Sequence, residues 1–104
     1  MMPATRRKSP LETLVVAVPE TAGSALYGMV DVLSAAGSLW PTLMRSGVAS
    51  APFRVRIVSP RARPFRCGNG IPVAPELAVR DDPPADIVIL PELWLGPDEH
   101  LGGR

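Results

Sequence analysis

Two short apolar runs in this chain stop on the same dipeptide, and this repeat constrains the fold more than any other feature. Leu14–Val18 runs into Pro19-Glu20, and Ile87–Leu90 runs into Pro91-Glu92. Both runs lack polar residues and are rich in β-branched side chains, which is typical of strands buried on both faces of a parallel sheet. Parallel strands end on one edge, where open α/β folds bind ligands, so both Pro-Glu pairs are expected beside a site.

Composition indicates one small soluble domain. The chain has 104 residues, is 46% hydrophobic and carries a net charge of +1. Its leader, Met1–Pro10, holds Arg6, Arg7 and Lys8, and without these three residues 8 basic side chains face 10 acidic ones. The remainder therefore offers no concentrated basic face for nucleic acid. The leader lacks the apolar core of a signal peptide and is expected to be disordered.

No membrane, metal or cofactor site is expected. No apolar stretch approaches the roughly 20 residues that span a bilayer, so we expect a cytoplasmic protein. The chain has one cysteine, Cys67, and one histidine, His100, which gives neither a disulfide framework nor a metal-ligand spacing. Asn69-Gly70 is a turn signal rather than a phosphate loop, because no glycine-rich run joins a strand to a helix there.

The first strand is followed by a helical pattern and then by a second strand. Apolar residues at i, i+3, i+4 and i+7 predict an amphipathic helix over Ser24–Ala36, capped by Ser24 and ended by Gly37. These residues are Leu26, Met29, Val30 and Leu33. Pro41 could open a second short helical turn through Leu43 and Met44. Phe53–Ser59 predicts a strand near a sheet edge, which completes the βαβ signal of a parallel sheet.

The second half of the chain is rich in turns. Pro64–Arg66 and Ile71–Val73 predict a turn or small hairpin around Cys67–Gly70. Ser46–Pro52 is expected to be a loop, and Glu76–Val79 is ambiguous. The last strand, Asp86–Leu90, is not followed by a helical pattern. A parallel sheet with one helix leaves an apolar face in water. A partner could cover that face, but we favour the interpretation that the chain is the front part of a longer domain.

Several of these segments together resemble a known family. Their order and spacing are similar to the start of the PfpI-like class I glutamine-amidotransferase-like domain, in particular the one at the amino terminus of AraC-type transcriptional regulators. Val58-Ser59-Pro60 matches the Val-Ser-Pro-like end of that family's second strand, and Asn69-Gly70 fits its turn before glycine. The matching segments are Leu14–Val18, Leu26–Leu33, Phe53–Pro60, Phe65–Gly70 and Ala85–Pro91.

The resemblance implies a fold and a domain organisation. The fold would be an α/β flavodoxin-like parallel sheet with flanking helices, truncated after its first half. Residues 1–10 would be a disordered basic leader, and residues 11–104 the amino-terminal part of the amidotransferase-like domain. In such regulators DNA is bound by a later helix-turn-helix domain that this chain lacks. The resemblance further implies a small-molecule effector, no membrane partner, and a homodimer in the full-length protein.

The residues that the family uses for catalysis are not matched here. In the enzymes, the nucleophilic cysteine follows a later strand, so Cys67 does not correspond to it. The acid at the start of their first helix falls on Ala25, and Glu20 could replace it or be a solvated loop acid. Acyl-transfer members have Pro-Gly-Gly where this chain has Pro91-Glu92-Leu93, so two side chains replace backbone that could approach an oxyanion.

These departures favour a non-catalytic, ligand-sensing or dimerising module of an AraC-type regulator, with no catalytic residue in this chain. Its expected ligand-binding residues are Glu20, Glu92 and Trp94, since small-molecule pockets are rich in aromatic side chains. Trp94 could instead pack on a helix of the same fold. The alternatives are the front half of a PfpI-like cysteine hydrolase, amidase or glyoxalase, and a small standalone α/β interaction protein.

Overall fold

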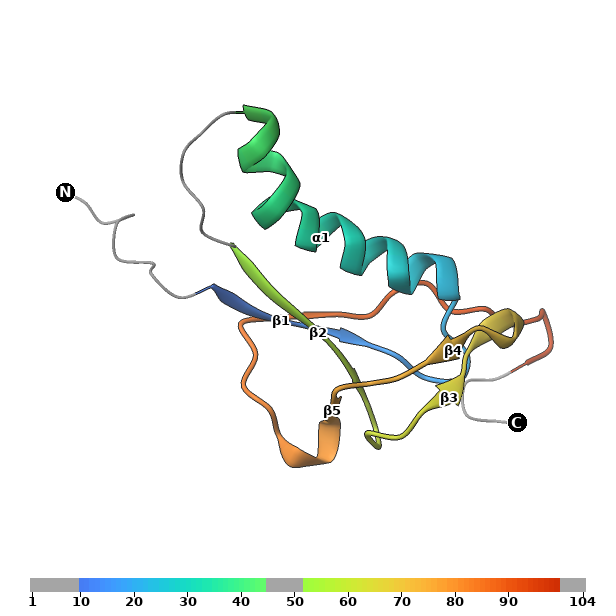
Figure 1. Ribbon diagram of the computed structural model, residues 1–104. Coiled ribbons are helices and arrows are strands. Elements are labelled where there is room, and N and C mark those ends of the chain that lie inside the picture. Colours follow the sequence, from blue (N-terminus) through green and yellow to red (C-terminus); the bar gives the residue numbers. More distant parts are fainter. Residues whose placement is uncertain (1–9, 45–51, 100–104) are drawn as a thin grey trace.

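The computed structural model describes residues 10–44 and 52–99 as a parallel sheet with one long helix on one side (Figure 1). His100 and almost all of the predicted leader and of the loop Ser46–Pro52 lie outside the described residues. The elements, in chain order, are β1 (Leu11–Val16), α1 (Gly23–Met44), β2 (Phe53–Ser59), β3 (Phe65–Arg66), the 3-10 turn η2 (Gly68–Gly70), β4 (Pro72–Val73), β5 (Leu77–Ala78), the 3-10 turn η3 (Val79–Asp81) and β6 (Ile87–Ile89).

The main sheet has four parallel strands in the order β5-β2-β1-β6. The pairing of β1 with β2 runs from Leu11 opposite Phe53 to Val16 opposite Val58. On its other side β1 pairs with β6, from Thr13 opposite Ile87 to Val15 opposite Ile89. The two apolar runs are therefore adjacent parallel strands that end on the same edge, and the prediction of an α/β flavodoxin-like parallel sheet is confirmed.

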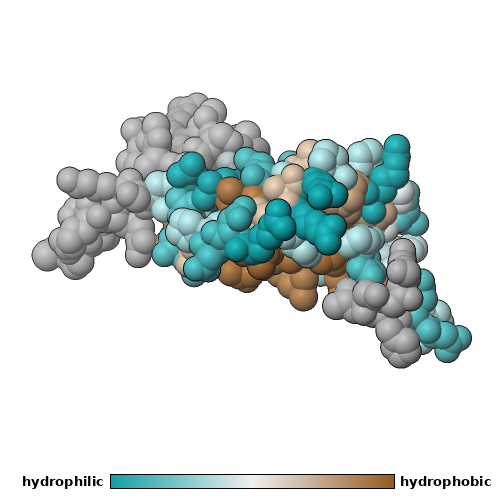
Figure 2. Space-filling model, turned by 90° about the horizontal axis from the view of Figure 1, so that it is seen from below, coloured by the Kyte–Doolittle hydropathy of each residue, from teal (hydrophilic) through white to brown (hydrophobic). Residues whose placement is uncertain are grey.

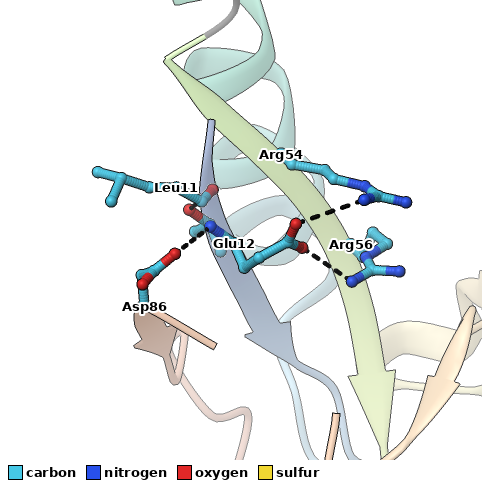
Figure 3. Close-up of polar contacts among 6 residues, drawn as sticks. Leu11, Glu12, Arg54, Arg56 and Asp86 are labelled. Atoms are coloured by element: carbon cyan, nitrogen blue, oxygen red, sulfur yellow. Dashed lines mark hydrogen bonds and ion pairs between the residues drawn. The ribbon is translucent and has the colours of Figure 1, made fainter. Parts of the chain in front are cut away.

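The first strand begins earlier than its apolar run, because polar side chains at its start are satisfied within the fold (Figure 3). The Glu12 N–H donates to an Asp86 carboxylate oxygen at 2.8 Å, and the Asp86 N–H donates to the Glu12 carbonyl at 2.8 Å. The Glu12 carboxylate pairs with Arg56 at 2.8 Å and with Arg54 at 3.4 Å. This network joins the amino ends of β1, β2 and β6, and extends β1 to Leu11.

The helix is longer than predicted. It runs as one element from Gly23 to Met44 and passes through Gly37, which does not end it, and through Pro41, which does not open a separate turn. A glycine inside a helix costs only about 1 kcal/mol relative to alanine, and the helix formers around Gly37 offset that cost. Ser24 lies inside the first turn of the helix. The first helical hydrogen bond is the one that the Leu26 N–H donates to the Ala22 carbonyl at 3.0 Å.

The helix buries its apolar stripe on one face of the sheet. Leu26 is completely buried against Val15 and Ala17 of the first strand and its continuation. Half-buried side chains complete this core, namely Met29, Val30, Val55, Ile57, Phe65 and Ile71. The core positions on and just after the strands are Val15, Ala17, Val55 and Ile57. Side chains two residues apart along a strand lie on the same face, which here is the face under α1.

The opposite face of the sheet is partly open, so the prediction that both runs are buried on both faces is wrong for β6. Val88 is 62% exposed, whereas Leu14 and Val58 on the same face are buried. A hollow of about 470 Å³ lies over this face, bounded by segment 82–85 and by Val79 and Val88. Figure 2, which views the molecule from below, shows hydrophobic surface between hydrophilic groups. The reason is that β6 is an edge strand over which no described helix packs.

The predicted hairpin is confirmed. Strands β3 and β4 pair antiparallel, with Phe65 opposite Val73 and Arg66 opposite Pro72. Asn69 and Gly70 adopt φ values of 61° and 73°, the left-handed conformation that these two residue types tolerate best. The ambiguous segment 76–79 contributes the two-residue strand β5, which shields only the end of β2 and leaves most of that strand at an edge. No helix among the described residues is long and apolar enough to cross a membrane.

Candidate ligand-binding edge

The carboxyl ends of β1 and β6 lie at the point where the strand order reverses. From β1 the chain passes through α1 to β2 on one side, while the connection from β5 crosses over to β6 on the other side. Such a switch point leaves a crevice in open α/β sheets and is where ligands bind. Pro19-Glu20 and Pro91-Glu92 follow these two strands, so both Pro-Glu pairs lie at the expected edge.

Main-chain hydrogen bonds close this crevice. Thr21 and Leu93 form an isolated antiparallel bridge. The Ala22 N–H donates to the Glu92 carbonyl at 2.8 Å, and the Trp94 N–H donates to the Glu20 carbonyl at 2.5 Å. The Gly68 N–H donates to the Thr21 carbonyl at 2.8 Å, which ties in the hairpin turn. Three loops far apart in the sequence are thereby joined through their backbones.

The three predicted ligand-binding residues are brought together, but their side chains differ in access to solvent. Glu20 is only 3% exposed, so its reading as a solvated loop acid is wrong. Glu92 is exposed, and Trp94 is 53% exposed. Trp94 therefore does not pack fully into the fold among the described residues. Their role in binding a ligand stays a prediction.

Cys67 lies in the same region but inside the core. It is 5% exposed and belongs to the cluster formed by Val15, Ala17, Leu26 and Val73. Burial raises the pKa of the Cys67 thiol above its ordinary value, and this outweighs the hydrogen bonds from the backbone that lower the pKa. Because the thiolate is the nucleophilic form, this setting suits a packing residue better than a nucleophile.

Two backbone donors at the crevice, those of Ala22 and Trp94, are already used. An oxyanion hole needs N–H groups that point at the ligand and are free to bind it. Here the N–H groups of Ala22 and Trp94 donate to protein carbonyls instead. Ala25, which stands where the resemblance places an acid, offers only a methyl group. These two N–H groups therefore hold the loops together.

An open pocket lies next to the closed crevice, at the carboxyl ends of β1 and β2. Its volume is about 390 Å³, and we call it the Arg61–Arg63 pocket. Its lining residues are Ala17, Pro19, Ser59, Pro60, Arg61, Arg63, Pro64 and Phe65. Sequence reasoning missed this pocket, although the signal was present. The second strand also ends at the ligand edge, on Ser59, and two arginines follow within four residues of that position.

The loop that forms this pocket is held by its own hydrogen bonds. The Ser59 hydroxyl donates to the Arg61 carbonyl, and the Arg63 N–H donates to the same carbonyl at 2.8 Å. Pro60 and Pro64 fix φ at two further positions. Both arginine side chains are exposed. The ion pairs at Glu12 lie at the other end of the sheet, and neither Arg61 nor Arg63 takes part in them.

The rest of the described chain offers no other obvious chemistry. No three His, Cys, Asp or Glu side chains among residues 10–36 and 52–99 come close enough together to hold a metal ion.

Comparison with known proteins gives no match to a protein-family model, to a curated protein or to a solved structure. A function must therefore be argued from the geometry of this edge.

The burial of Cys67 predicts a thiol that is hard to reach. We expect the native chain at neutral pH to react with a thiol reagent at least about tenfold more slowly than the urea-unfolded chain, because both the low thiolate fraction and the core packing oppose attack. The rate of colour release from an aromatic disulfide reagent measures this. Equal rates in the two states would contradict the burial of Cys67.

The close approach of three loops at Gly68 predicts that a methyl group there lowers the stability of the fold. A Cβ at Gly68 would lie 2.9 Å from the Thr21 carbonyl oxygen and 2.9 Å from the Trp94 Cβ. We expect Gly68→Ala to lower the free energy of unfolding by about 1–3 kcal/mol, since this contact is with backbone that cannot move aside cheaply. Urea unfolding measures the loss.

The matched control is Gly28→Ala on α1, where an added Cβ meets nothing within 4 Å. It should leave stability unchanged or raise it by up to about 1 kcal/mol, because alanine favours a helix. In a Trp40→Phe background, only Gly68→Ala should also shift the emission of Trp94, the indole that remains. Equal effects of the two alanines would show that the loops do not meet at Gly68.

Proposed function

We propose that this chain is the amino-terminal part of a non-catalytic, ligand-sensing or dimerising amidotransferase-like domain of an AraC-type transcriptional regulator. The observation that carries the proposal is the closed crevice between β1 and β6. The N–H groups of Ala22 and Trp94 there are used in the pairing of segments 20–22 and 92–94. A site that must stabilise a reaction intermediate needs those donors free, whereas a binding module does not.

The open pocket beside the crevice supports the sensing part of the proposal. It lies on the ligand-binding edge of a parallel sheet, and its volume of about 390 Å³ suits a small molecule. Its walls come from the ends of β1 and β2 and from the loop after β2. An effector there would therefore contact segments that lead directly into α1 and into the β3–β4 hairpin. Occupancy could therefore be sensed by the rest of the domain.

The open face of the sheet supports the dimerising part. Parallel sheets are stable with both faces covered, and here Val79 and Val88 remain half or more exposed. In a regulator, the remainder of the domain or a second subunit would cover this surface. DNA would then be bound only by a separate helix-turn-helix domain, and the protein would act as a cytoplasmic homodimer.

One observation favours the alternative, the front half of a PfpI-like hydrolase. Glu20 is buried in the loop between β1 and α1, close to the place where enzymes of that family carry their acid. The coding sequence downstream of Arg104 separates the two proposals. A helix-turn-helix pair after the α/β domain supports the regulator, and a cysteine on a strand-to-helix turn followed by a histidine would overturn it.

The regulator proposal also predicts that residues 1–104 do not bind DNA by themselves. Without the leader the chain is slightly acidic, so it cannot release many counterions from a duplex. A gel-shift titration with mixed-sequence duplex DNA at about 50 mM salt should show no complex at micromolar protein. A tight complex that weakens steeply with salt would contradict the assignment of DNA binding to another domain.

A further inference from the structure

We propose that the Arg61–Arg63 pocket binds a small carboxylate that carries an apolar body, such as an aliphatic or aromatic monocarboxylic acid. This inference rests on the ligand-sensing role proposed above and gives that role a site and a ligand class. The proposed site is the pocket at the carboxyl ends of β1 and β2, and not the crevice at Glu20 and Glu92. Its support comes from the charge, the walls, the size and the rigidity of the pocket.

The charge of the pocket is positive and not compensated. Arg61 and Arg63 both line it, and none of the other described lining residues is acidic. Neither arginine takes part in the salt bridges at Glu12, which lie at the amino ends of the strands. A guanidinium presents a planar fork of donors that matches the two oxygens of a carboxylate. Two such groups at one mouth therefore favour an anion.

The walls of the pocket are apolar. Ala17 is buried at its base, and Phe65 is half-buried and packs against the core cluster. Three prolines, at positions 19, 60 and 64, form the rest of the lining. Exposed ion pairs contribute little by themselves, because water screens them. The apolar body of a ligand must therefore supply much of the affinity, which disfavours inorganic phosphate and acetate.

The size and the rigidity of the pocket limit the ligand further. Its volume of about 390 Å³ is near the lower end of small-molecule sites, which span roughly 300–1,000 Å³. The loop is pre-ordered by the two hydrogen bonds to the Arg61 carbonyl. A pre-ordered loop loses little entropy when it binds a ligand. These properties suit a small organic acid better than a nucleotide or a peptide.

The test is a titration of the 104-residue chain, followed through its backbone amide NMR signals. The probe is 3-phenylpropionate, and the matched neutral probe is 3-phenylpropionamide. Acetate and inorganic phosphate serve as anions without an apolar body. We expect 3-phenylpropionate at millimolar concentration to shift the signals of Ala17, Ser59, Arg61 and Phe65, and the amide to bind at least about fivefold more weakly.

Arginine variants test whether binding depends on the two arginines of the pocket or only on the net charge of the protein. Arg61→Gln and Arg63→Gln should each weaken binding of 3-phenylpropionate about fivefold, which corresponds to about 1 kcal/mol. Both side chains are exposed, so these changes should leave the fold intact. The control is Arg80→Gln, an exposed arginine on η3 outside the pocket lining. It should leave the affinity unchanged.

Three results would overturn the proposal. They are equal binding of the acid and the amide, equal loss with Arg80→Gln, and no shift of the pocket signals by 3-phenylpropionate. None of them bears on the downstream sequence, which tests the regulator proposal separately. Binding that depends on both arginines, in a chain followed by a catalytic cysteine turn, would keep the site and reject the regulator.

Discussion

The central position of β1 is the constraint on which the rest of the structure depends. This strand pairs in parallel with β2 on one side and with β6 on the other. Its amino end is fixed by Glu12, which bonds to Asp86 and pairs with Arg56. Val15 of this strand and Ala17 just after its end belong to the core under α1. Because all four strands run in the same direction, their carboxyl ends and the loops that follow them are gathered at one edge.

At that edge, main-chain hydrogen bonding decides which space is open. Buried backbone donors must find acceptors, and the loops after β1 and β6 satisfy each other across the switch point. The loop after β2 instead satisfies itself, through the bonds of Ser59 and Arg63 to one carbonyl. It therefore stands away from its neighbours and leaves a pocket. The proposed regulator would sense its effector in this neighbouring pocket rather than in the closed crevice.

Local patterns were enough to predict the architecture. The two β-branched runs predicted parallel strands that end on one edge, and Asn69-Gly70 predicted a turn or small hairpin, because backbone preferences dominate at those places. The end of the helix was not predictable, since the cost of Gly37 is small against the continuing helix. The burial of Glu20 depends on loops that approach from residues 68 and 93, which no local pattern encodes. The pocket arginines follow a strand end, the same signal that singled out both Pro-Glu pairs.

Hydrogen exchange of single amides tests the central claim most directly. If the crevice is closed by its own backbone, the N–H groups of Ala22, Gly68 and Trp94 are bonded in the native state. Their exchange should then be slowed to within about tenfold of that of Val15 in the central strand, while Arg61 and Ala62 in the pocket loop exchange fast. Exchange of Ala22 and Trp94 at the rate of an unprotected loop, with β1 still protected, would contradict this account.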